Sequence, residues 1–502
     1  MQHLRIDSIL AGHAVAGPGR PAITFNGIVT DFAGLEAQVA SMAGWLASRG
    51  VGVGDRVAIY ARNHPESFIL LFAVSRIGAM MVPLNWRLSG DELAWQMADA
   101  SPAMLLYGAD FAATADQLGR SAGCPTFEIG AKLDTARKGH AMDAENDSGA
   151  DSRAYSGAGS ADAELMVVYT SGTTGRPKGA VLGQAAMRAN AEMSHHAYAM
   201  TSDDLVLNIL PLFHVGGLNI QPLPALLVGA GVVIHDGFDP AAVLATISSE
   251  RITQMTVVPT ILGALLGAPE WQGADLSSLR MMAIGSTDVP VALIEAVHAR
   301  GIPVVQVYGA TETSPTAIYQ TADIATSTVG SIGRAGSRCK IRITSNDGTE
   351  LPVDEVGEIR VRGDNILTRY WNNEAASAES IVDGWFRTGD MARLDADGLY
   401  WFADRLKHVI ISGGENIYPA ELERVLSDFD GLTEFAIVGR DDPRWGQVPV
   451  VVAARSGPRV TSDDVLAHFE GRIARFKRPK DCLLYTSPSP RDRTRSRMPS
   501  SA

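Results

Sequence analysis

The sequence contains little cysteine and no apolar run long enough to cross a membrane. Its three cysteines, Cys124, Cys339 and Cys482, match no metal-binding spacing and are ordinary for a protein of the reducing cytosol. Residues 68–74 and 223–234 are the best membrane candidates, but Arg76 stops the first run and the second is too short to span a bilayer. The N-terminus shows no basic region followed by a long apolar segment, which a signal peptide requires. We therefore expect a cytoplasmic protein without a membrane span.

Positive charge is also scarce, because 56 acidic residues outnumber 43 lysines and arginines and give a formal net charge of −13. This balance argues against nucleic acid and anionic membranes as partners. A site for an anionic nucleotide must then create its own local positive field. With 502 residues, 46% of them hydrophobic and 20% charged, the chain has the composition of a globular protein of two or more domains.

The first part of the chain alternates apolar strands with helical patterns. Apolar residues at helical spacing predict helices over 35–46 and 67–77, and the run 56–60 predicts a strand between them. This alternation predicts a mostly parallel sheet covered by helices, and thus an α/β fold. Further along, strands are predicted at 104–107, 165–168, 205–210, 255–259 and 281–285, and a helix over 184–200. Residues 134–162, rich in Ala, Ser, Gly and Asp, predict a surface connection.

The pattern changes twice toward the C-terminus. Between residues 341 and 361 strands alternate with turns, which predicts a β-rich subdomain. Beyond residue 403 a small α+β domain is predicted, with strands at 409–411, 434–438 and 448–453 and helices at 419–427 and 463–475. We therefore predict a large N-terminal domain over 1–403, a small C-terminal domain over 404–480, and a tail of different character over 481–502.

Residues 169–179 (YTSGTTGRPKG) follow the apolar run 165–168 and combine glycines, hydroxyls and two cations. Glycines let backbone N–H groups turn toward an anion, hydroxyls donate without adding charge, and Arg176 and Lys178 supply positive charge. This composition suits a polyphosphate. The segment is not the familiar P-loop, which has Ser or Thr after its lysine, because Gly179 follows Lys178. A polar connection between a strand and a helix is the alternative interpretation.

Three further motifs follow this segment in order. They are YGATET at 308–313, GWFRTGD at 384–390, and DRLK at 404–407 with SGGEN at 412–416. Together with residues 169–179, they resemble the motifs of the adenylate-forming superfamily, which contains acyl-CoA synthetases, peptide-synthetase adenylation domains and firefly-type luciferases. The resemblance extends from near the N-terminus to residue 480. It implies a large N-terminal domain followed by a small mobile C-terminal domain.

The resemblance implies that a carboxylic acid is activated with ATP. A carboxylate oxygen attacks the α-phosphate, so that an acyl-adenylate forms and pyrophosphate leaves; CoA then takes the acyl group and AMP is released. The protein has to align the repelling anions and neutralise the charge that moves onto pyrophosphate. Mg²⁺ suits this task, since it is held by few protein carboxylates and several phosphate oxygens. The expected cofactors and partners are ATP, Mg²⁺, coenzyme A and a small carboxylic acid.

The resemblance also implies roles for the residues that match. The β- and γ-phosphates would lie against the loop residues Thr170, Ser171, Gly172, Thr173, Thr174, Gly175 and Lys178. Tyr308 would stack on adenine, Thr311 would donate to the α-phosphate and Glu312 would hold Mg²⁺. Asp390 would accept both ribose hydroxyls, and Arg405 would bind ribose or phosphate oxygens. Taken singly, each could be a turn, a cap or a surface ion pair, but the ordered set favours the functional interpretation.

The acyl and CoA sides of the site are implied by the same resemblance. His214 would border the acyl pocket and act as a gate, although a structural histidine is the alternative. Lys407 would lie at the hinge between domains, and Gly413 and Gly414 would leave a slot for pantetheine. The acyl pocket and the adenine side would be lined by Val215, Gly216, Gly217, Val258, Gly285, Ser286 and Thr287. Residues 285–287 (GST) depart from the family's commoner Gly-Gly-Ala or Gly-Gly-Glu, which weakens the expectation for Ser286.

The C-terminal segment departs further from the family. Relatives carry a Gly-Lys pair there, whose lysine reaches the reacting carboxylate and the α-phosphate. No lysine follows Lys480 in this sequence, and residues 481–502 are rich in Ser, Pro and Arg. We interpret 481–502 as a non-native tail, with a divergent natural tail as the alternative. Without that lysine we expect the adenylation step to be slow.

An acid–CoA ligase for a fatty or aromatic acid is the leading interpretation. Val215, Leu218 and Val258 predict an apolar pocket. Three alternatives remain: an adenylation domain that loads a carrier protein, a luciferase-type oxidation of the adenylate, and a non-catalytic binder of nucleotide or acyl-adenylate. Amino-acid activators usually place an Asp after the Phe, where this chain has His214 after Phe213. An α-amino acid is therefore disfavoured as the substrate.

Overall fold

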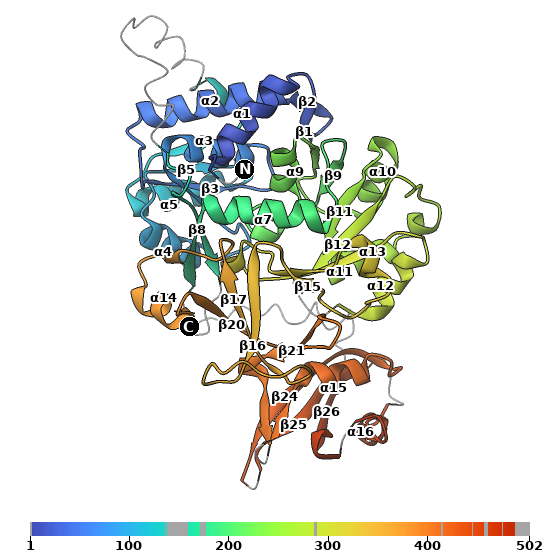
Figure 1. Cartoon of the computed structure of the whole chain (residues 1–502). Helices are drawn as coiled ribbons and strands as arrows, with labels where there is room; N and C mark the ends of the chain where they lie inside the picture. The colour runs from blue at the N-terminus through green and yellow to red at the C-terminus, as the bar shows by residue number, and fades with distance from the viewer. Residues whose placement is uncertain are drawn as a thin grey trace, which may run out of the picture. The chain divides into compact units, whose positions relative to one another are not determined.

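The computed structural model describes residues 3–135, 137, 159–170, 177–285, 289–412, 415–443, 445–455, 460–473 and 475–486 (Figure 1). The chain forms two compact units. The first consists of Met1–Ile341 with Arg360–Thr388, and the second of Arg342–Ile359 with Gly389–Ala502. The predicted domain limits at residues 403 and 480 remain predictions.

One sheet of the first unit has seven strands in the order β18-β8-β7-β4-β3-β5-β6. Their bounds are β3 Arg56–Tyr60, β4 Met80–Pro83, β5 Met104–Tyr107, β6 Thr126–Glu128, β7 Glu164–Thr170, β8 Lys178–Gly183 and β18 Arg369–Tyr370. Strands β3 to β7 pair in parallel, whereas β8 runs antiparallel to both β7 and β18. Residues 169–179 therefore connect two antiparallel strands, and their interpretation as a connection between a strand and a helix is wrong. The short run GAVLG after Lys178 has too few residues for its periodicity to have indicated the strand.

The second sheet of this unit has nine strands in the order β15-β14-β13-β12-β11-β9-β10-β1-β2. Their bounds are β1 Pro21–Phe25, β2 Ile28–Asp31, β9 Leu205–Asn208, β10 Gly231–Ile234, β11 Gln254–Val257, β12 Met281–Gly285, β13 Val304–Tyr308, β14 Ile318–Tyr319 and β15 Arg334–Ala335. The six central strands pair in parallel, and β2, β14 and β15 pair antiparallel at the two edges. The prediction of mostly parallel sheets is confirmed.

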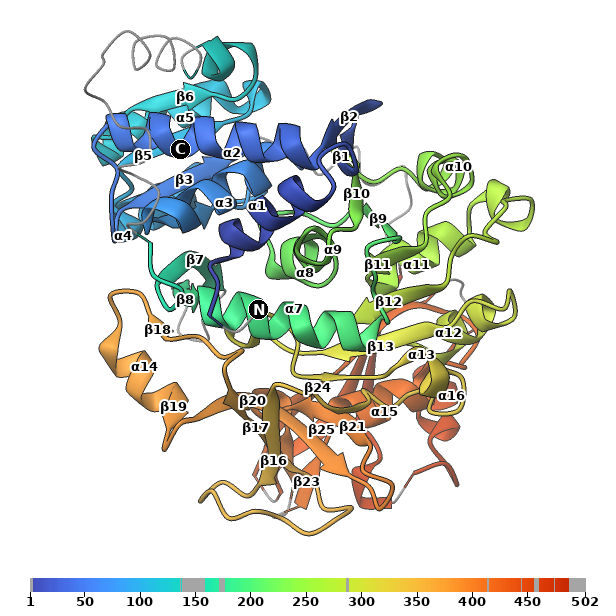
Figure 2. The same cartoon turned by 45° about the horizontal axis from the view of Figure 1, so that its top comes forward.

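Helices connect these strands along the chain. Their bounds are α1 Ile6–Ala16, α2 Phe32–Ser48, α3 Glu66–Ile77, α4 Gly90–Ala100, α5 Ala112–Ala122, α7 Gln184–Ala197, α8 Val215–Asn219, α9 Pro222–Val228, α10 Pro240–Glu250, α11 Pro259–Leu266, α12 Val291–His298 and α13 Ala322–Ala325. Helices α1, α2 and α3 lie side by side (Figure 2). The helices predicted over 35–46, 67–77 and 184–200 correspond to α2, α3 and α7, with ends that differ by a few residues.

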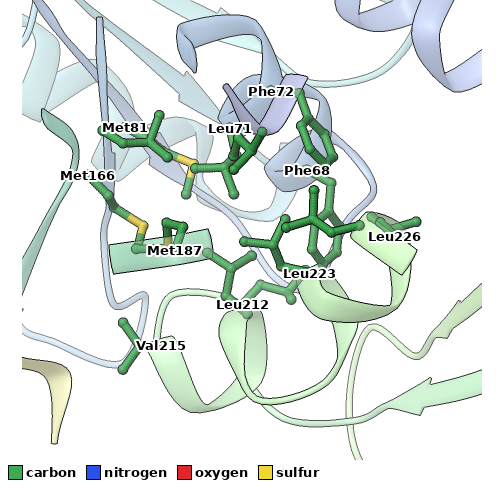
Figure 3. Packing of buried hydrophobic residues seen from close by; sticks show 14 of the residues in the cluster. Phe68, Leu71, Phe72, Met81, Met166, Met187, Leu212, Val215, Leu223 and Leu226 are labelled. Carbon is green, nitrogen blue, oxygen red and sulfur yellow. The ribbon is translucent and has the colours of Figure 1, made fainter. Parts of the chain in front are cut away.

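Helix α3 lies in the core of the first unit and is buried along almost its whole length. Its Phe68 and Phe72 pack in one apolar cluster with Met166 of β7 and Leu223 of α9 (Figure 3). A helix surrounded by protein is apolar on every face, so its sequence does not show the polar stripe of a surface helix. This burial explains the apolar run at 68–74. In the described part of the chain no helix is long and apolar enough to cross a membrane.

A five-stranded sheet follows, with the order β16-β17-β20-β19 and with β21 paired to β20. Its strands are β16 Cys339–Thr344, β17 Gly357–Gly363, β19 Ile381–Val382, β20 Trp385–Leu394 and β21 Tyr400–Arg405, and helix α14 (Glu374–Ser380) precedes β19. The boundary between the two units passes through β16, β17 and β20. The predicted β-rich subdomain is confirmed.

The C-terminal part of the second unit is a small α+β structure, as predicted. Strands β22 (Ile410–Ser412), β23 (Glu415–Ile417), β24 (Leu432–Asp442), β25 (Gly446–Arg455) and β26 (Asp481–Thr486) form one sheet, with helices α15 (Pro419–Leu426) and α16 (Ser462–His468). Helix α16 is shorter than the predicted 463–475, since Gly471 has a φ of +72° that a helix does not contain. Strand β26 pairs in parallel with β25. Residues 487–502 of the predicted tail, and most of the connection predicted at 134–162, lie outside the described residues.

Candidate active site

The β7–β8 hairpin brings the two ends of the segment 169–179 together. Thr170 and Lys178 face each other across the hairpin, and the Thr170 hydroxyl donates to the Lys178 carbonyl oxygen at 3.3 Å. The residues predicted to bind phosphate between them, Ser171, Gly172, Thr173, Thr174 and Gly175, lie outside the described residues. The structure therefore describes the base of the loop, where its first hydroxyl and its lysine lie.

The base of this hairpin is held by contacts with helix α4 and with Trp371. The Tyr169 hydroxyl donates to the Asp99 carboxylate at 2.6 Å, and Trp371 Nε1 donates to the Asp99 carbonyl oxygen at 3.0 Å. Burial, followed by the hydrogen bond to Asp99, raises the pKa of Tyr169, so this phenol stays a donor at neutral pH. At Gly179 a Cβ atom would lie 2.9 Å from Val167 Cγ1 and 3.2 Å from Trp371 Cβ, which leaves no room for a side chain.

The motif 308–313 forms a tight turn at the end of β13. Tyr308 is the last residue of that strand, and the short 3₁₀ helix η3 (Thr311–Thr313) follows it. The Ala310 N–H donates to Thr313 Oγ1 at 2.9 Å, which closes the turn. A Cβ atom at Gly309 would lie 1.6 Å from the Pro315 carbonyl oxygen, so only glycine fits at this position. The turn fixes where Thr311 and Glu312 lie relative to the sheet.

Glu312 lies beside the base of the hairpin. Its Oε1 accepts a hydrogen bond from the Tyr370 hydroxyl at 2.9 Å and lies 3.4 Å from the Thr170 hydroxyl oxygen, within reach of the same proton that faces the Lys178 carbonyl. The ammonium of Lys178 lies 5.3 Å from the centre of the same Tyr370 ring. The structure thus brings together Thr170, Lys178 and Glu312, three of the predicted site residues. Tyr370 was not predicted, because its side chain reaches them from a strand that carries no recognisable motif.

In the second unit, Asp390 and Arg405 form an ion pair. They are paired residues of the adjacent strands β20 and β21, and Arg405 Nε lies 3.3 Å from Asp390 Oδ1. Asp390 is buried, whereas the Arg405 side chain is 55% exposed. The neighbouring Gly389 has a φ of +68°, a conformation that favours glycine. Lys407 lies in the 3₁₀ helix η4 (Leu406–His408); its side chain and the residues Gly413 and Gly414 lie outside the described residues.

His214 immediately precedes helix α8, and its imidazole reaches solvent. Its ring lies 4.5 Å from that of Phe213, measured between centres. The surrounding protein atoms, followed by the Arg87 guanidinium, lower the pKa of His214, so its ring is neutral at pH 7. Val215 is buried at the start of α8, and Gly217 approaches the Pro211 carbonyl oxygen so closely that a Cβ atom would lie 2.2 Å from it.

The other residues predicted beside the acyl pocket lie at the ends of β11 and β12. Val258 precedes helix α11 and is partly buried. Gly285 ends β12, and a Cβ atom there would lie 2.4 Å from the Val307 carbonyl oxygen of β13. Ser286 and Thr287 lie outside the described residues. The glycine at 285 is thus required by the close approach of two strands.

We predict that Gly309→Ala disrupts the turn that carries Glu312. The added methyl group would meet the Pro315 carbonyl oxygen at 1.6 Å, so the turn has to open. We expect a loss of about 1–3 kcal/mol in the free energy of unfolding and a clear loss of ATP affinity. Urea unfolding and calorimetric titration with ATP measure the two effects. In the control Gly12→Ala, on helix α1, the new methyl group meets nothing within 4 Å; equal ATP binding by Gly309→Ala and this control would contradict the prediction.

Comparison with known proteins identifies the family. The family model described as AMP-binding enzyme matches residues 10–371, and the model of the AMP-binding enzyme C-terminal domain matches residues 421–496. An indoleacetate–CoA ligase from Aromatoleum aromaticum is 43% identical over 482 residues, which cover 94% of this chain and 92% of the relative. A feruloyl-CoA synthase from an Amycolatopsis species is 38% identical, over 92% of this chain and 91% of its own.

Solved structures agree with this relationship. The o-succinylbenzoate CoA synthetase from Bacillus subtilis, in complex with its acyl-adenylate intermediate, superimposes with a TM-score of 0.82 at 31% identity, covering 96% of this chain and 95% of that one. The same enzyme has been solved with ATP and a magnesium ion, with a TM-score of 0.81 at 30% identity and 95% coverage of each chain. These matches favour a ligase over a carrier-loading domain or a non-catalytic binder. The chain belongs to the adenylate-forming superfamily of AMP-binding enzymes and is an AMP-forming acid–CoA ligase, with a carboxylic acid, ATP and CoA as its substrates.

Proposed function

We propose that this ligase activates an aromatic monocarboxylic acid whose ring is joined to the carboxylate by a short chain. The observation that carries this proposal is the set of relatives at 35–43% identity, which are named for indoleacetate, ferulate and 2-succinylbenzoate. Each alignment covers more than nine-tenths of this chain. In the predicted pocket, the described residues Val215, Gly216, Gly217, Leu218 and Val258 carry no charge. A flat apolar ring suits such a lining, and a second carboxylate finds no cation among these residues.

For the adenylation step we propose that Lys178 and residues 171–175 hold the terminal phosphates of ATP. Thr311 would donate to the α-phosphate, and Tyr308 would stack on adenine. Glu312, together with phosphate oxygens, would hold Mg²⁺, whose charge offsets that of the triphosphate. The donor set fits this ion, since Mg²⁺ prefers oxygen ligands and Glu312 Oε1 lies 3.4 Å from the Thr170 hydroxyl.

The remaining roles concern the ribose, the acyl pocket and CoA. Asp390 would accept both ribose hydroxyls, and Arg405 would bind an adjacent ribose or phosphate oxygen. His214 would gate the acyl pocket, which suits a neutral ring that packs at a tilt against Phe213 and reaches solvent. The hinge and the pantetheine slot would include Lys407, Gly413 and Gly414, and the adenine side would include Gly285 and Ser286. We also propose a cytoplasmic location, which the three free cysteines support.

A panel of carboxylic acids tests the proposed substrate class. AMP release with ATP, Mg²⁺ and CoA would be followed for indoleacetate, phenylacetate and ferulate, for octanoate, and for the dicarboxylate 2-succinylbenzoate. We expect the aromatic monocarboxylates to have the highest kcat/KM. The second carboxylate of 2-succinylbenzoate would enter an apolar pocket that offers it no cation. We expect its kcat/KM to be at least about tenfold lower, since an unpaired buried charge is strongly unfavourable. A preference for octanoate would instead indicate a fatty-acid ligase.

Replacement of Asp390 by Asn tests the proposed ribose contact. The amide keeps the size of the side chain but removes the charge and one acceptor, so ATP affinity should fall about 10- to 100-fold, as expected for hydrogen bonds to a charged group. The matched control is Asp383→Asn, which changes an exposed aspartate with a φ of +53° that Asn tolerates. Calorimetry with ATP and with inorganic pyrophosphate separates the causes. Asp390→Asn should leave pyrophosphate affinity unchanged, and a parallel loss of both would point to a disturbed fold.

The two half-reactions should differ in speed, because no lysine follows Lys480 in this chain. Loss of one group that stabilises charge in the transition state costs about 10²–10³ in rate. We expect slow ATP–pyrophosphate exchange by the unaltered chain. The reference is a variant whose residues after Lys480 come from the indoleacetate–CoA ligase. Both proteins should convert supplied acyl-adenylate and CoA to thioester at the same rate. That variant should restore exchange. Fast exchange by the unaltered chain would show that another group does the work of this lysine.

A further inference from the structure

Residues 367–371 connect the two halves of the candidate phosphate site. The Leu367 N–H donates to the Glu312 carbonyl oxygen at 2.8 Å, and the Trp371 N–H donates to the Gly179 carbonyl oxygen at 2.7 Å. Between them, β18 pairs with β8, so that Tyr370 lies opposite Ala180. The backbone on both sides of Tyr370 is therefore tied to the hairpin of Lys178 and to the turn of Glu312.

The side chain of Tyr370 contacts both charged groups. It is 6% exposed, its hydroxyl donates to Glu312 Oε1 at 2.9 Å, and its ring centre lies 5.3 Å from Lys178 Nζ. Its own N–H donates to Ser377 Oγ at 2.9 Å, and the preceding Arg369 binds both oxygens of Glu164 at 2.8 Å. These contacts hold strand β18 in place. The Tyr370 side chain on this strand can therefore hold the Glu312 carboxylate and the Lys178 ammonium in position.

Lys178 and Glu312 carry opposite charges, and both contact Tyr370: the ammonium lies over its ring, and the carboxylate accepts a hydrogen bond from its hydroxyl. In the part of the chain that the structure describes, no carboxylate forms an ion pair with Lys178, and its ammonium lies over the face of the Tyr370 ring. A cation over an aromatic face is attracted to it but is not neutralised. A direct pair between Lys178 and Glu312 would occupy both groups, and it would have to break before a phosphate and a metal ion could use them.

We propose that Tyr370 is a positioning residue that keeps Lys178 and Glu312 from pairing with each other. Its ring retains the ammonium for the nucleotide phosphates, and its hydroxyl orients the carboxylate for Mg²⁺. The inference rests on the proposed function, since it takes Lys178 and Glu312 as the phosphate and metal ligands. It adds a residue that acts through both of them.

Two substitutions separate the two contacts. Tyr370→Phe keeps the ring and removes the hydroxyl, so the Mg²⁺ concentration for half-maximal ATP–pyrophosphate exchange should rise about 10- to 100-fold, while metal-free ATP affinity stays unchanged. Tyr370→Leu removes both contacts, so Lys178 pairs with Glu312 and metal-free ATP affinity falls as well. Calorimetry with ATP in EDTA, and Mn²⁺ binding followed by electron paramagnetic resonance in the presence of ATP, give readouts that do not depend on turnover.

A double substitution distinguishes the proposed role from a general structural one. Adding Glu312→Gln to Tyr370→Leu removes the carboxylate that would capture Lys178, so metal-free ATP affinity should return to the value of Glu312→Gln alone. If Tyr370→Leu simply damages the fold, the second change restores nothing and the proposal fails. The control Tyr198→Phe, at a buried tyrosine whose hydroxyl has no hydrogen-bond partner in the described structure, should change neither measurement.

Failure of the inference and failure of the proposed function give different results. If Lys178→Ala and Glu312→Gln impair ATP and Mn²⁺ binding but both Tyr370 variants bind like the unaltered chain, only the role of Tyr370 is wrong. If Lys178→Ala and Glu312→Gln themselves bind ATP and Mn²⁺ unchanged, the proposed phosphate and metal ligands are wrong, and the role of Tyr370 falls with them.

Discussion

The candidate phosphate site depends on main-chain hydrogen bonds between residues 367–371 and two separate turns. Thr170 and Glu312 are 142 residues apart in the sequence, yet their side chains meet. They meet because β18 adds to β8 on one side, while the Leu367 N–H reaches the turn of Glu312 on the other. The distance between the Lys178 ammonium and the Glu312 carboxylate therefore depends on the register of the sheet, which changes only in steps of a whole residue.

An acidic protein that binds a polyanion has to keep some cations from being neutralised. With 56 acidic residues and 43 lysines and arginines, this chain contains more carboxylates than cations to pair with them. The described surroundings of Lys178 place an aromatic face next to its ammonium. Arg405 in the second unit shows the other arrangement, since it pairs with the buried Asp390. An aromatic neighbour holds a cation without lowering its charge, and this suits a group that must later meet a phosphate.

Local patterns predicted much of the fold and part of the site. Apolar runs bounded by turn residues predicted strands such as 56–60 and 281–285, because burial on both faces makes such runs continuous. The ordered motifs predicted that Lys178 and Glu312 share a site. Tyr370 and Asp99 could not be predicted in this way, because their partners Glu312 and Tyr169 are 58 and 70 residues away. Contacts across such separations follow from tertiary packing, which no window of the sequence records.

The glycines of the motifs illustrate a further limit of reading roles from a pattern. A motif contains residues that bind a ligand and residues, such as glycine, that let two backbone segments pack closely. The sequence of the motif alone does not tell the two kinds apart. At Gly309 and Gly285 a Cβ atom would collide with the carbonyl oxygens of Pro315 and Val307, at 1.6 Å and 2.4 Å. Packing alone therefore requires glycine at both positions, whatever the ligand. A substitution there would move Thr311 and Glu312, or the end of β12, and its effect on nucleotide binding would be indirect. The proposed contacts with the nucleotide are better tested at Lys178 and Asp390, where a substitution changes a charged side chain and not a glycine that the backbone requires.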